Sequence, residues 1–273
     1  MPSLRALVDA GHDVALVVSQ PDKKRGRGAT LLPSPVKAAA LELGLPVTDK
    51  VDDAIGVGAD LGVVVAFGRL IKPHVLAALP MVNIHFSLLP RWRGAAPLER
   101  AILAGDTETG VCLMQLEEGL DTGPVYACER ITIGADETAD ELRGRLVEAG
   151  TRLLLDAVDG GLGEPTPQEG ETTYADKLDP AELRLDWQRP AEDLYRVVRL
   201  GRAWTTFRGH RLRVLAARLV EGGAGPGVLD GLIVGGGDGR GLELLTVQPE
   251  GKGPQPAAAW RNGARPHPGE TFE

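Results

Sequence analysis

The first half of the chain alternates between strand-like and helix-like patterns of hydrophobic positions. Residues 61–67 form a continuous apolar run rich in valine, which is typical of a strand buried on both faces. Shorter strand patterns cover residues 14–19, 82–85 and 111–116, and helical patterns cover residues 3–10, 35–43, 72–79, 97–104 and 137–155. Strands that alternate with helices predict an α/β fold with a doubly wound, mostly parallel sheet.

The composition changes near residue 160. Residues 160–171 are rich in glycine, proline and acidic residues, which indicates a linker. The chain then shows one helical pattern and several short strand patterns separated by glycine turns, at residues 191–200, 211–219, 227–234 and 242–247. We expect a first domain over residues 1–164, a linker over 165–180 and a small C-terminal β-barrel domain over 181–273.

Composition and charge exclude several classes of protein. The 273 residues are 43% hydrophobic and 25% charged, as in ordinary globular proteins. No apolar run approaches the ~18 residues of a membrane span and no signal-peptide pattern opens the chain, so we expect a cytoplasmic protein. In that compartment Cys112 and Cys128 are expected to be reduced thiols. A net charge of −8 argues against a protein whose whole surface coats nucleic acid.

The densest polar cluster follows the strand predicted at residues 82–85. Asn83 and His85 are two positions apart, so their side chains share one face of the strand. Ligands bind at the carboxyl ends of strands in open α/β sheets, and the turn formed by residues 87–90 could meet a flat ligand there. The alternative is structural: Asn83 caps a turn, and His85 is a core histidine with its hydrogen bonds satisfied.

A second cluster, residues 118–124, contains Asp121 between glycines and follows the strand predicted at 111–116. Asp121 could simply form an Asx-turn. If it meets His85 instead, no nucleophile stands beside the pair, since Ser87 lacks a glycine elbow. Direct transfer between two bound substrates then fits better than a covalent intermediate. Asn83 and His85 would donate hydrogen bonds to the oxygen of a tetrahedral intermediate. Asp121 would orient and charge His85, or take a proton from an attacking amine.

The sequence gives little support for a metal site or a nucleotide-binding site. None of the five histidines pairs with another at helical spacing, and no Cys-x-x-Cys occurs, so we expect no metal. The glycine-rich motifs that bind dinucleotides or triphosphates are also absent from the sequence. The run at residues 235–239 indicates a hairpin turn instead.

Two segments are strongly basic. One is a glycine-containing loop after a strand, with the cations Lys23, Lys24, Arg25 and Arg27. The other, residues 189–218, holds eight arginines against two acidic residues. Such segments are often solvated surface, but two of them on an acidic protein favour a phosphate backbone as partner. Trp204 and Phe207 in the second segment could stack on bases, although a place in the core is the better expectation.

The motifs together resemble those of a known family. The pattern Asn-x-His-x-Ser-Leu-Leu-Pro at residues 83–90 and the Asp-x-Gly at 121–123 are similar to motifs of formyltetrahydrofolate-dependent transferases. These motifs alone do not fix the acceptor. Gln-Pro-Asp before the basic loop, Arg-Trp-Arg-Gly-Ala-Ala-Pro at 91–97 and Thr-Tyr-Ala-Asp-Lys-Leu at 173–178 resemble the methionyl-tRNA formyltransferases, over nearly the whole chain.

The resemblance implies formyl transfer from 10-formyltetrahydrofolate to the α-amine of methionine on initiator tRNA. It assigns catalysis to Asn83, His85 and Asp121. It assigns folate contacts to Ser87, Leu88, Leu89 and Pro90. It implies that Lys23, Lys24, Arg25 and Arg27 bind at the acceptor end of the tRNA. The second domain would be a tRNA-binding barrel like those that bind oligonucleotides, and a monomer is expected because this architecture works as one.

The chain departs from the family at its start. Members begin with a strand and a Gly-Thr-Pro-x-Phe-Ala loop, whereas this sequence opens with the helical pattern at residues 3–10. We therefore expect an N-terminal truncation that removes a strand from the middle of the sheet and opens the folate pocket. Two alternatives stay open: another 10-formyltetrahydrofolate enzyme that acts on a small amine or hydrolyses the formyl group, and an inactive remnant.

Overall fold

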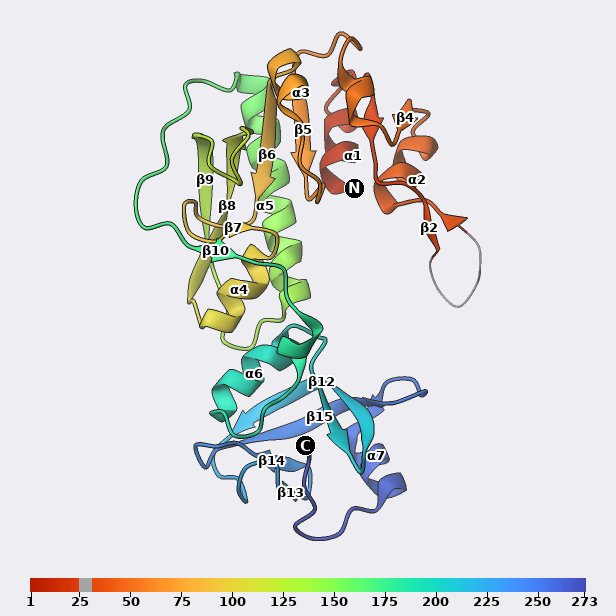
Figure 1. Ribbon diagram of the computed structural model, residues 1–273, viewed down its shortest axis with the longest axis vertical. Helices are drawn as coiled ribbons and strands as arrows, with labels where there is room; N and C mark the ends of the chain where they lie inside the picture. Colours follow the sequence, from red (N-terminus) through yellow and green to blue (C-terminus); the bar gives the residue numbers. More distant parts are fainter. Residues whose placement is uncertain (25–30) are drawn as a thin grey trace. The chain divides into compact units, whose positions relative to one another are not determined.

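The computed structural model describes residues 1–24 and 31–273, which form two compact units (Figure 1). The first unit comprises Met1–Pro97, Glu108–Thr132 and Gly144–Asp176. The second comprises Leu98–Thr107, Ile133–Arg143 and Lys177–Glu273. Each unit therefore draws on separate stretches of the chain, and each is described by itself.

The helices and strands of the first half include all of those expected from the sequence. The strands are β1 (Val17–Val18), β2 (Lys23–Lys24), β3 (Leu31–Leu32), β4 (Val47–Thr48), β5 (Gly62–Val65), β6 (Met81–His85), β7 (Arg93–Gly94), β8 (Glu108–Gln115) and β9 (Val125–Thr132). The helices are α1 (Pro2–Asp9), α2 (Pro35–Glu42), η1 (Val51–Ala54), α3 (Pro73–Ala78), α4 (Pro97–Ala104) and α5 (Ala139–Gly160). Strand β10 (Tyr174–Ala175) pairs with β7.

The main sheet of the first unit has the order β5-β6-β8-β9. Strands β5 and β6 are parallel, whereas β6–β8 and β8–β9 are antiparallel. The prediction of a mostly parallel sheet was wrong for these strands. The chain returns from β8 into β9 through the short loop at residues 116–124, and a loop without a crossover helix can join only antiparallel neighbours.

Among the described strands, β1 pairs only with β4, and β5 pairs only with β6. The short sheet β1-β4 is thus separate from the main sheet. The side chain of Gln20, just after β1, connects the two, because its Nε2 donates to the carbonyl of Phe67, just after β5, at 2.7 Å.

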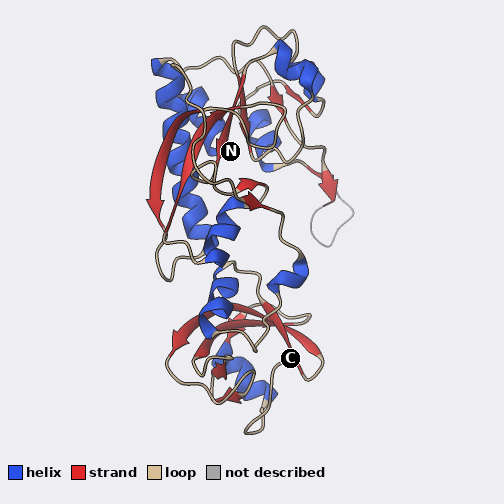
Figure 2. Cartoon of the chain, turned by 60° about the vertical axis from the view of Figure 1, so that its left-hand side comes forward, coloured by secondary structure: helices blue, strands red, loops and turns tan. Residues whose placement is uncertain are grey.

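Helix α5 runs along the main sheet (Figures 1 and 2). Its residue Gly150 allows the close approach, since a Cβ there would lie 2.6 Å from Ile84 Cγ2 and 3.0 Å from Val111 Cγ2. Any larger side chain at this position would push the helix away from β6 and β8.

Cys112 on β8 and Cys128 on β9 form a disulfide, so the expectation of two reduced thiols was wrong. The two cysteines are register partners on neighbouring antiparallel strands, with their Cα atoms 4.1 Å apart. Side chains of directly opposite residues project from the same face, which brings the sulfurs together. Cys112 is also the register partner of His85 on β6.

The second unit is rich in β-structure. Its elements after Lys177 are η2 (Pro180–Leu183), α6 (Ala191–Arg199), β11 (Trp204–Phe207), β12 (His210–Val220), β13 (Leu229–Asp230), β14 (Ile233–Gly235), β15 (Gly241–Pro249), β16 (Gln255–Pro256) and α7 (Ala257–Ala264). The sheet has the order β11-β12-β15-β14-β13, with β16 beside β15. No pairing among the described strands joins β11 to β13, so the predicted barrel is not closed. The glycine run at residues 235–239 is the predicted turn, between β14 and β15.

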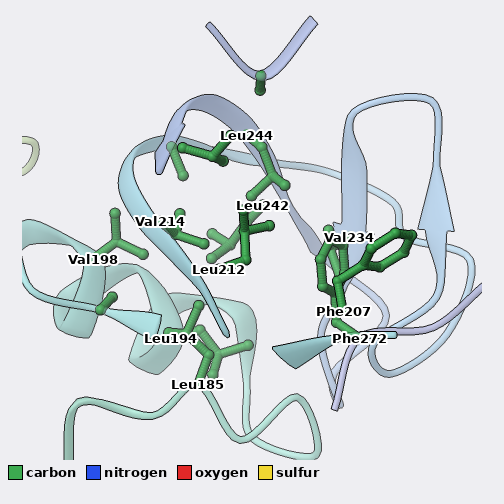
Figure 3. Close-up of a cluster of buried hydrophobic side chains, with 14 of the residues drawn as sticks. Leu185, Leu194, Val198, Phe207, Leu212, Val214, Val234, Leu242, Leu244 and Phe272 are labelled. Carbon is green, nitrogen blue, oxygen red and sulfur yellow. The ribbon is translucent and has the colours of Figure 1, made fainter. Parts of the chain in front are cut away.

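The core of the second unit lies between this sheet and its helices (Figure 3). Phe207 is buried there beside Phe272 and Trp260, as expected for a core residue. Trp204 is half-buried, and the guanidinium of Arg211 lies 4.3 Å from its ring centroid. Trp204 and Phe207 thus both have partners within the protein.

Candidate active site

His85 ends strand β6 and is 5% exposed. Its Nε2–H donates to the carbonyl of Trp92 at 2.9 Å, and its Nδ1 faces Asp121 Oδ2 at 3.6 Å. Burial lowers the pKa of His85, while the charge of Asp121 and the bond to Trp92 act in the opposite direction. The neutral ring therefore carries its proton on Nε2, since a carbonyl can only accept, and Nδ1 is left as an acceptor.

Asp121 lies in the loop between β8 and β9, far from His85 in sequence. Its Oδ2 accepts a hydrogen bond from the Gly94 backbone N–H at 2.8 Å, on the segment that follows β6. The carboxylate thus contacts a different part of the chain. It does not form the Asx-turn that the sequence analysis gave as the alternative. The loop can return this tightly because Gly123 has no Cβ, which would lie 2.0 Å from the Gln115 carbonyl oxygen.

Asn83 lies two positions before His85 on β6 and is half-buried. Alternation along a strand places both side chains on the same face of the sheet. The Asn83 amide makes no hydrogen bond to another of the described residues. The amide can therefore donate to a bound molecule, whereas both ring nitrogens of His85 face protein groups.

The turn after β6 holds the four residues expected to contact folate. Ser87 is fully buried and its hydroxyl donates to the carbonyl of Arg91 at 2.6 Å, so it stabilises the turn itself. Leu88 and Leu89 are half-buried, and Leu89–Pro90 is a cis peptide bond. Leu88 packs so closely on Gly110 of β8 that a Cβ on that glycine would lie 2.4 Å from its Cδ2.

Four further residues, Trp92, Arg93, Gln168 and Thr173, make hydrogen bonds around the pair, and the sequence analysis gave none of them a role in the site. The Trp92 N–H donates to Thr173 Oγ1 at 2.9 Å. The Arg93 guanidinium donates to Gln168 Oε1, and the Gln168 amide donates in turn to the carbonyl of Asp121. Gln168 and Thr173 lie on the stretch where composition indicated a linker, and a composition cannot reveal which side chains fold back.

The basic residues are arranged differently from the sequence expectation. Lys23 and Lys24 form β2, which pairs with β3, while Arg25 and Arg27 lie outside the described residues. In the second unit most arginines of residues 189–218 have acidic or carbonyl partners, in the pairs Arg189–Asp193, Arg196–Glu192, Arg202–Glu99, Arg208–Glu270 and Arg218–Glu243, and Arg199 with the carbonyls of Gly134 and Glu137. The net positive charge of residues 189–218 therefore overstates how basic the surface of the second unit is.

A cavity of about 290 Å³ borders this part of the second unit. It is lined by cationic and aromatic side chains, among them Arg208, His210, Arg211, Lys252 and Trp260.

Within the described residues, no group of histidine, cysteine or acidic side chains is arranged to hold a metal ion. No helix in the same residues is long and apolar enough to cross a membrane.

Two family models match the chain: formyl transferase over residues 3–158, and the C-terminal domain of formyl transferase over residues 177–265. The methionyl-tRNA formyltransferase of Roseobacter denitrificans is 45% identical over 293 residues, covering 100% of this chain and 95% of that protein. The methionyl-tRNA formyltransferase of Cereibacter sphaeroides is 46% identical over 272 residues, covering 93% of this chain and 89% of that protein. Matches of this length do not support the truncation expected from the opening helix.

The fold is shared more widely. An N-formyltransferase from Helicobacter canadensis, solved with folinic acid and dTDP-3-aminofucose, superposes with a TM-score of 0.68 over 89% of this chain and 94% of that one, at 16% identity. A structural match at 16% identity shows a shared fold only. The two family models and the relatives above 40% identity show similarity in the amino-acid sequence as well. The chain therefore belongs to the formyl transferase family, and within it to the methionyl-tRNA formyltransferases.

Proposed function

We propose that the chain transfers the formyl group of 10-formyltetrahydrofolate to the α-amino group of methionine on initiator tRNA, and that Asn83, His85 and Asp121 perform the transfer. The observation that carries the proposal is the meeting of a buried imidazole and a carboxylate, 3.6 Å apart, at the end of β6. The half-buried amide of Asn83 lies two positions away on the same strand face.

The reaction forms a bond between the amine nitrogen and the formyl carbon, and breaks the bond between that carbon and N10 of the folate. The tetrahedral intermediate carries negative charge on the formyl oxygen, and Asn83 donates a hydrogen bond to it. The attacking amine loses a proton to the His85–Asp121 pair, and the proton then passes to N10 as the folate leaves.

The lowered pKa of His85 fits the role of proton acceptor, because a neutral ring with Nε2–H on Trp92 presents an unprotonated Nδ1. Once Nδ1 gains the proton, the imidazolium is stabilised by the adjacent Asp121 carboxylate. This assignment modifies the expectation that His85 donates to the oxyanion from the start, since Nε2–H is already bonded.

The turn at residues 87–90 would contact the folate through Leu88, Leu89 and Pro90, while Ser87 holds the turn in shape. The β2–β3 hairpin, with Lys23, would approach the acceptor end of the tRNA, as would Arg25 and Arg27. In the second unit, the cavity beside Arg211 and Lys252 offers cations for the phosphate backbone. A monomer in the cytoplasm suffices for these roles, with a catalytic domain over residues 1–164, a connection over 165–180 and a tRNA-binding domain over 181–273.

A direct assay tests the proposal. Purified protein is mixed with 10-formyltetrahydrofolate and methionyl initiator tRNA, and formyl-methionine is measured with and without the tRNA. His85→Ala and Asp121→Ala should each lower the rate by ~10²–10⁴ while circular dichroism and thermal unfolding stay as in the parent protein. A near-normal rate in either variant removes that residue from the mechanism. Transfer to a small amine, or hydrolysis, without tRNA would replace the acceptor proposed here.

A further inference from the structure

Gln168 touches both of the loops that meet at the His85–Asp121 pair. Its Nε2 donates to the carbonyl of Asp121 at 2.9 Å and to the carbonyl of Gly123 at 2.8 Å. Its Oε1 accepts from Nε and Nη2 of Arg93, at 3.1 and 2.7 Å. A glutamine amide has two N–H donors and one carbonyl, so every polar group of this side chain is used.

These bonds close a ring of contacts around Asp121. Arg93 is followed by Gly94, whose N–H donates to Asp121 Oδ2 at 2.8 Å. The carboxylate of Asp121 is thus held by Gly94, and its backbone carbonyl is held through Gln168 by Arg93. The same turn supplies the Trp92 carbonyl that accepts from His85. Gln168 therefore fixes the carboxylate relative to the group that orients the imidazole.

The backbone of Asp121 needs such support. Its φ is +50°, in the left-handed region that residues other than glycine adopt at a cost of ~1–3 kcal/mol. A conformation of this kind persists where surrounding contacts determine it. The hydrogen bond from Gln168 reaches the carbonyl of Asp121 itself, and the second bond reaches Gly123 further along the loop.

We propose that Gln168 is a positioning residue for formyl transfer, whose side-chain amide clamps the Asp121 loop to the turn at residues 92–94 and so sets the carboxylate–imidazole distance. The inference rests on the proposed roles of His85 and Asp121. The side-chain hydrogen bonds of Gln168 go to Arg93 and to two backbone carbonyls, not to the side chains of His85 or Asp121, so it acts on the reaction through the position of Asp121.

The test compares Gln168→Met and Gln168→Glu with the parent protein. Methionine preserves the shape and removes all four hydrogen bonds, whereas glutamate still accepts from Arg93 but cannot donate to the two carbonyls. We expect both variants to lower kcat about 10- to 100-fold, because displacement of a catalytic group by about 1 Å has that effect. KM for folate and for tRNA should change less than about threefold, since binding contacts are retained. Gln188→Met is the matched control, because Gln188 is exposed and its side chain makes no hydrogen bond to the other described residues.

Two further measurements separate positioning from general stability. In Gln168→Met, the pKa of His85 followed by NMR should fall further, because Asp121 is the charged group that raises it. In an Asp121→Asn background, Gln168→Met should cause little additional loss of kcat, since residues that act as one unit are not additive. A full multiplicative loss in the double variant, or an unchanged kcat in both single variants, would overturn the inference. Normal rates in Asp121→Ala and His85→Ala would instead overturn the proposed function, and so the two failures are distinct.

Discussion

Replacing Gly123 by alanine should separate Asp121 from His85 without touching either residue. A Cβ at Gly123 would lie 2.0 Å from the carbonyl oxygen of Gln115, while ordinary contact begins at 3.4 Å. The loop or the end of β8 must therefore shift by about 1.4 Å, the difference between these two distances. The obstacle is backbone, which cannot rotate aside as a flexible side chain would.

A displacement of this size should lower kcat by about 10²-fold and destabilise the protein by about 1–3 kcal/mol. The bonds from Gly94 to Asp121 and from Gln168 to Gly123, each 2.8 Å long, would be the first to lengthen. Single-turnover formylation of methionyl-tRNA measures the first effect, and urea unfolding measures the second.

Gly144→Ala is the control for the Gly123 variant. Gly144 is exposed on α5, and the position that an alanine methyl group would take there has nothing within 4 Å. Alanine in a helix interior should stabilise the protein by roughly 0.5–1 kcal/mol. If Gly123→Ala kept kcat within about twofold of the parent and unfolded at the same urea concentration, the loop would not be held against β8 as described.

Three other outcomes are expected. Thr205→Val should destabilise the second unit by about 1–3 kcal/mol in urea unfolding, because it leaves the buried Trp187 Nε1–H, now 3.0 Å from Thr205 Oγ1, without an acceptor. The hydrogen bond from Arg208 lowers the pKa of Glu270 from 4.5 to about 2, so its stabilisation should be present above pH 4.5 and lost as pH falls towards 2. Unfolding curves of Glu270→Gln and the parent should therefore converge in acid. Cys128→Ser should lower the free energy of unfolding by about 2–4 kcal/mol in non-reducing buffer and have little effect in reducing buffer. A thiol titration of the unreduced, denatured parent should find no free cysteine.

The sequence was informative where structure depends on local periodicity. The spacing of Asn83 and His85 predicted one shared face at the end of a strand, and β6 has that geometry. The glycine run at residues 235–239 predicted a hairpin turn, because glycine adopts the required backbone angles without strain. Phe207 was expected in the core and lies there.

The features that depend on tertiary contacts were harder to predict. That Asp121 meets His85 could only be stated as a condition, since it depends on how the loop after β8 returns. The link between Cys112 and Cys128 depends on the register of β8 with β9, and β9 was not predicted from the hydrophobic pattern. Composition also overstated the basic surface of the second unit, because it counts arginines such as Arg208 and Arg218 without the glutamates that neutralise them.

The segment at residues 166–175 explains why the site could not be located fully from its motifs. Its polar composition, with one glycine and one proline, indicates a chain without a core of its own, and every residue in it except the buried Ala175 is half-buried or exposed. Yet Thr166 exchanges backbone hydrogen bonds with Val125, and Thr173 and Ala175 accept from Arg93 and Ala95. These bonds hold the segment along its length, so that Gln168 reaches Asp121 from a fixed backbone. The proposed catalytic pair lies on a strand end and a loop, His85 on β6 and Asp121 after β8, and a third stretch of chain fixes their separation. A stretch without hydrophobic periodicity can do so through its hydrogen bonds alone.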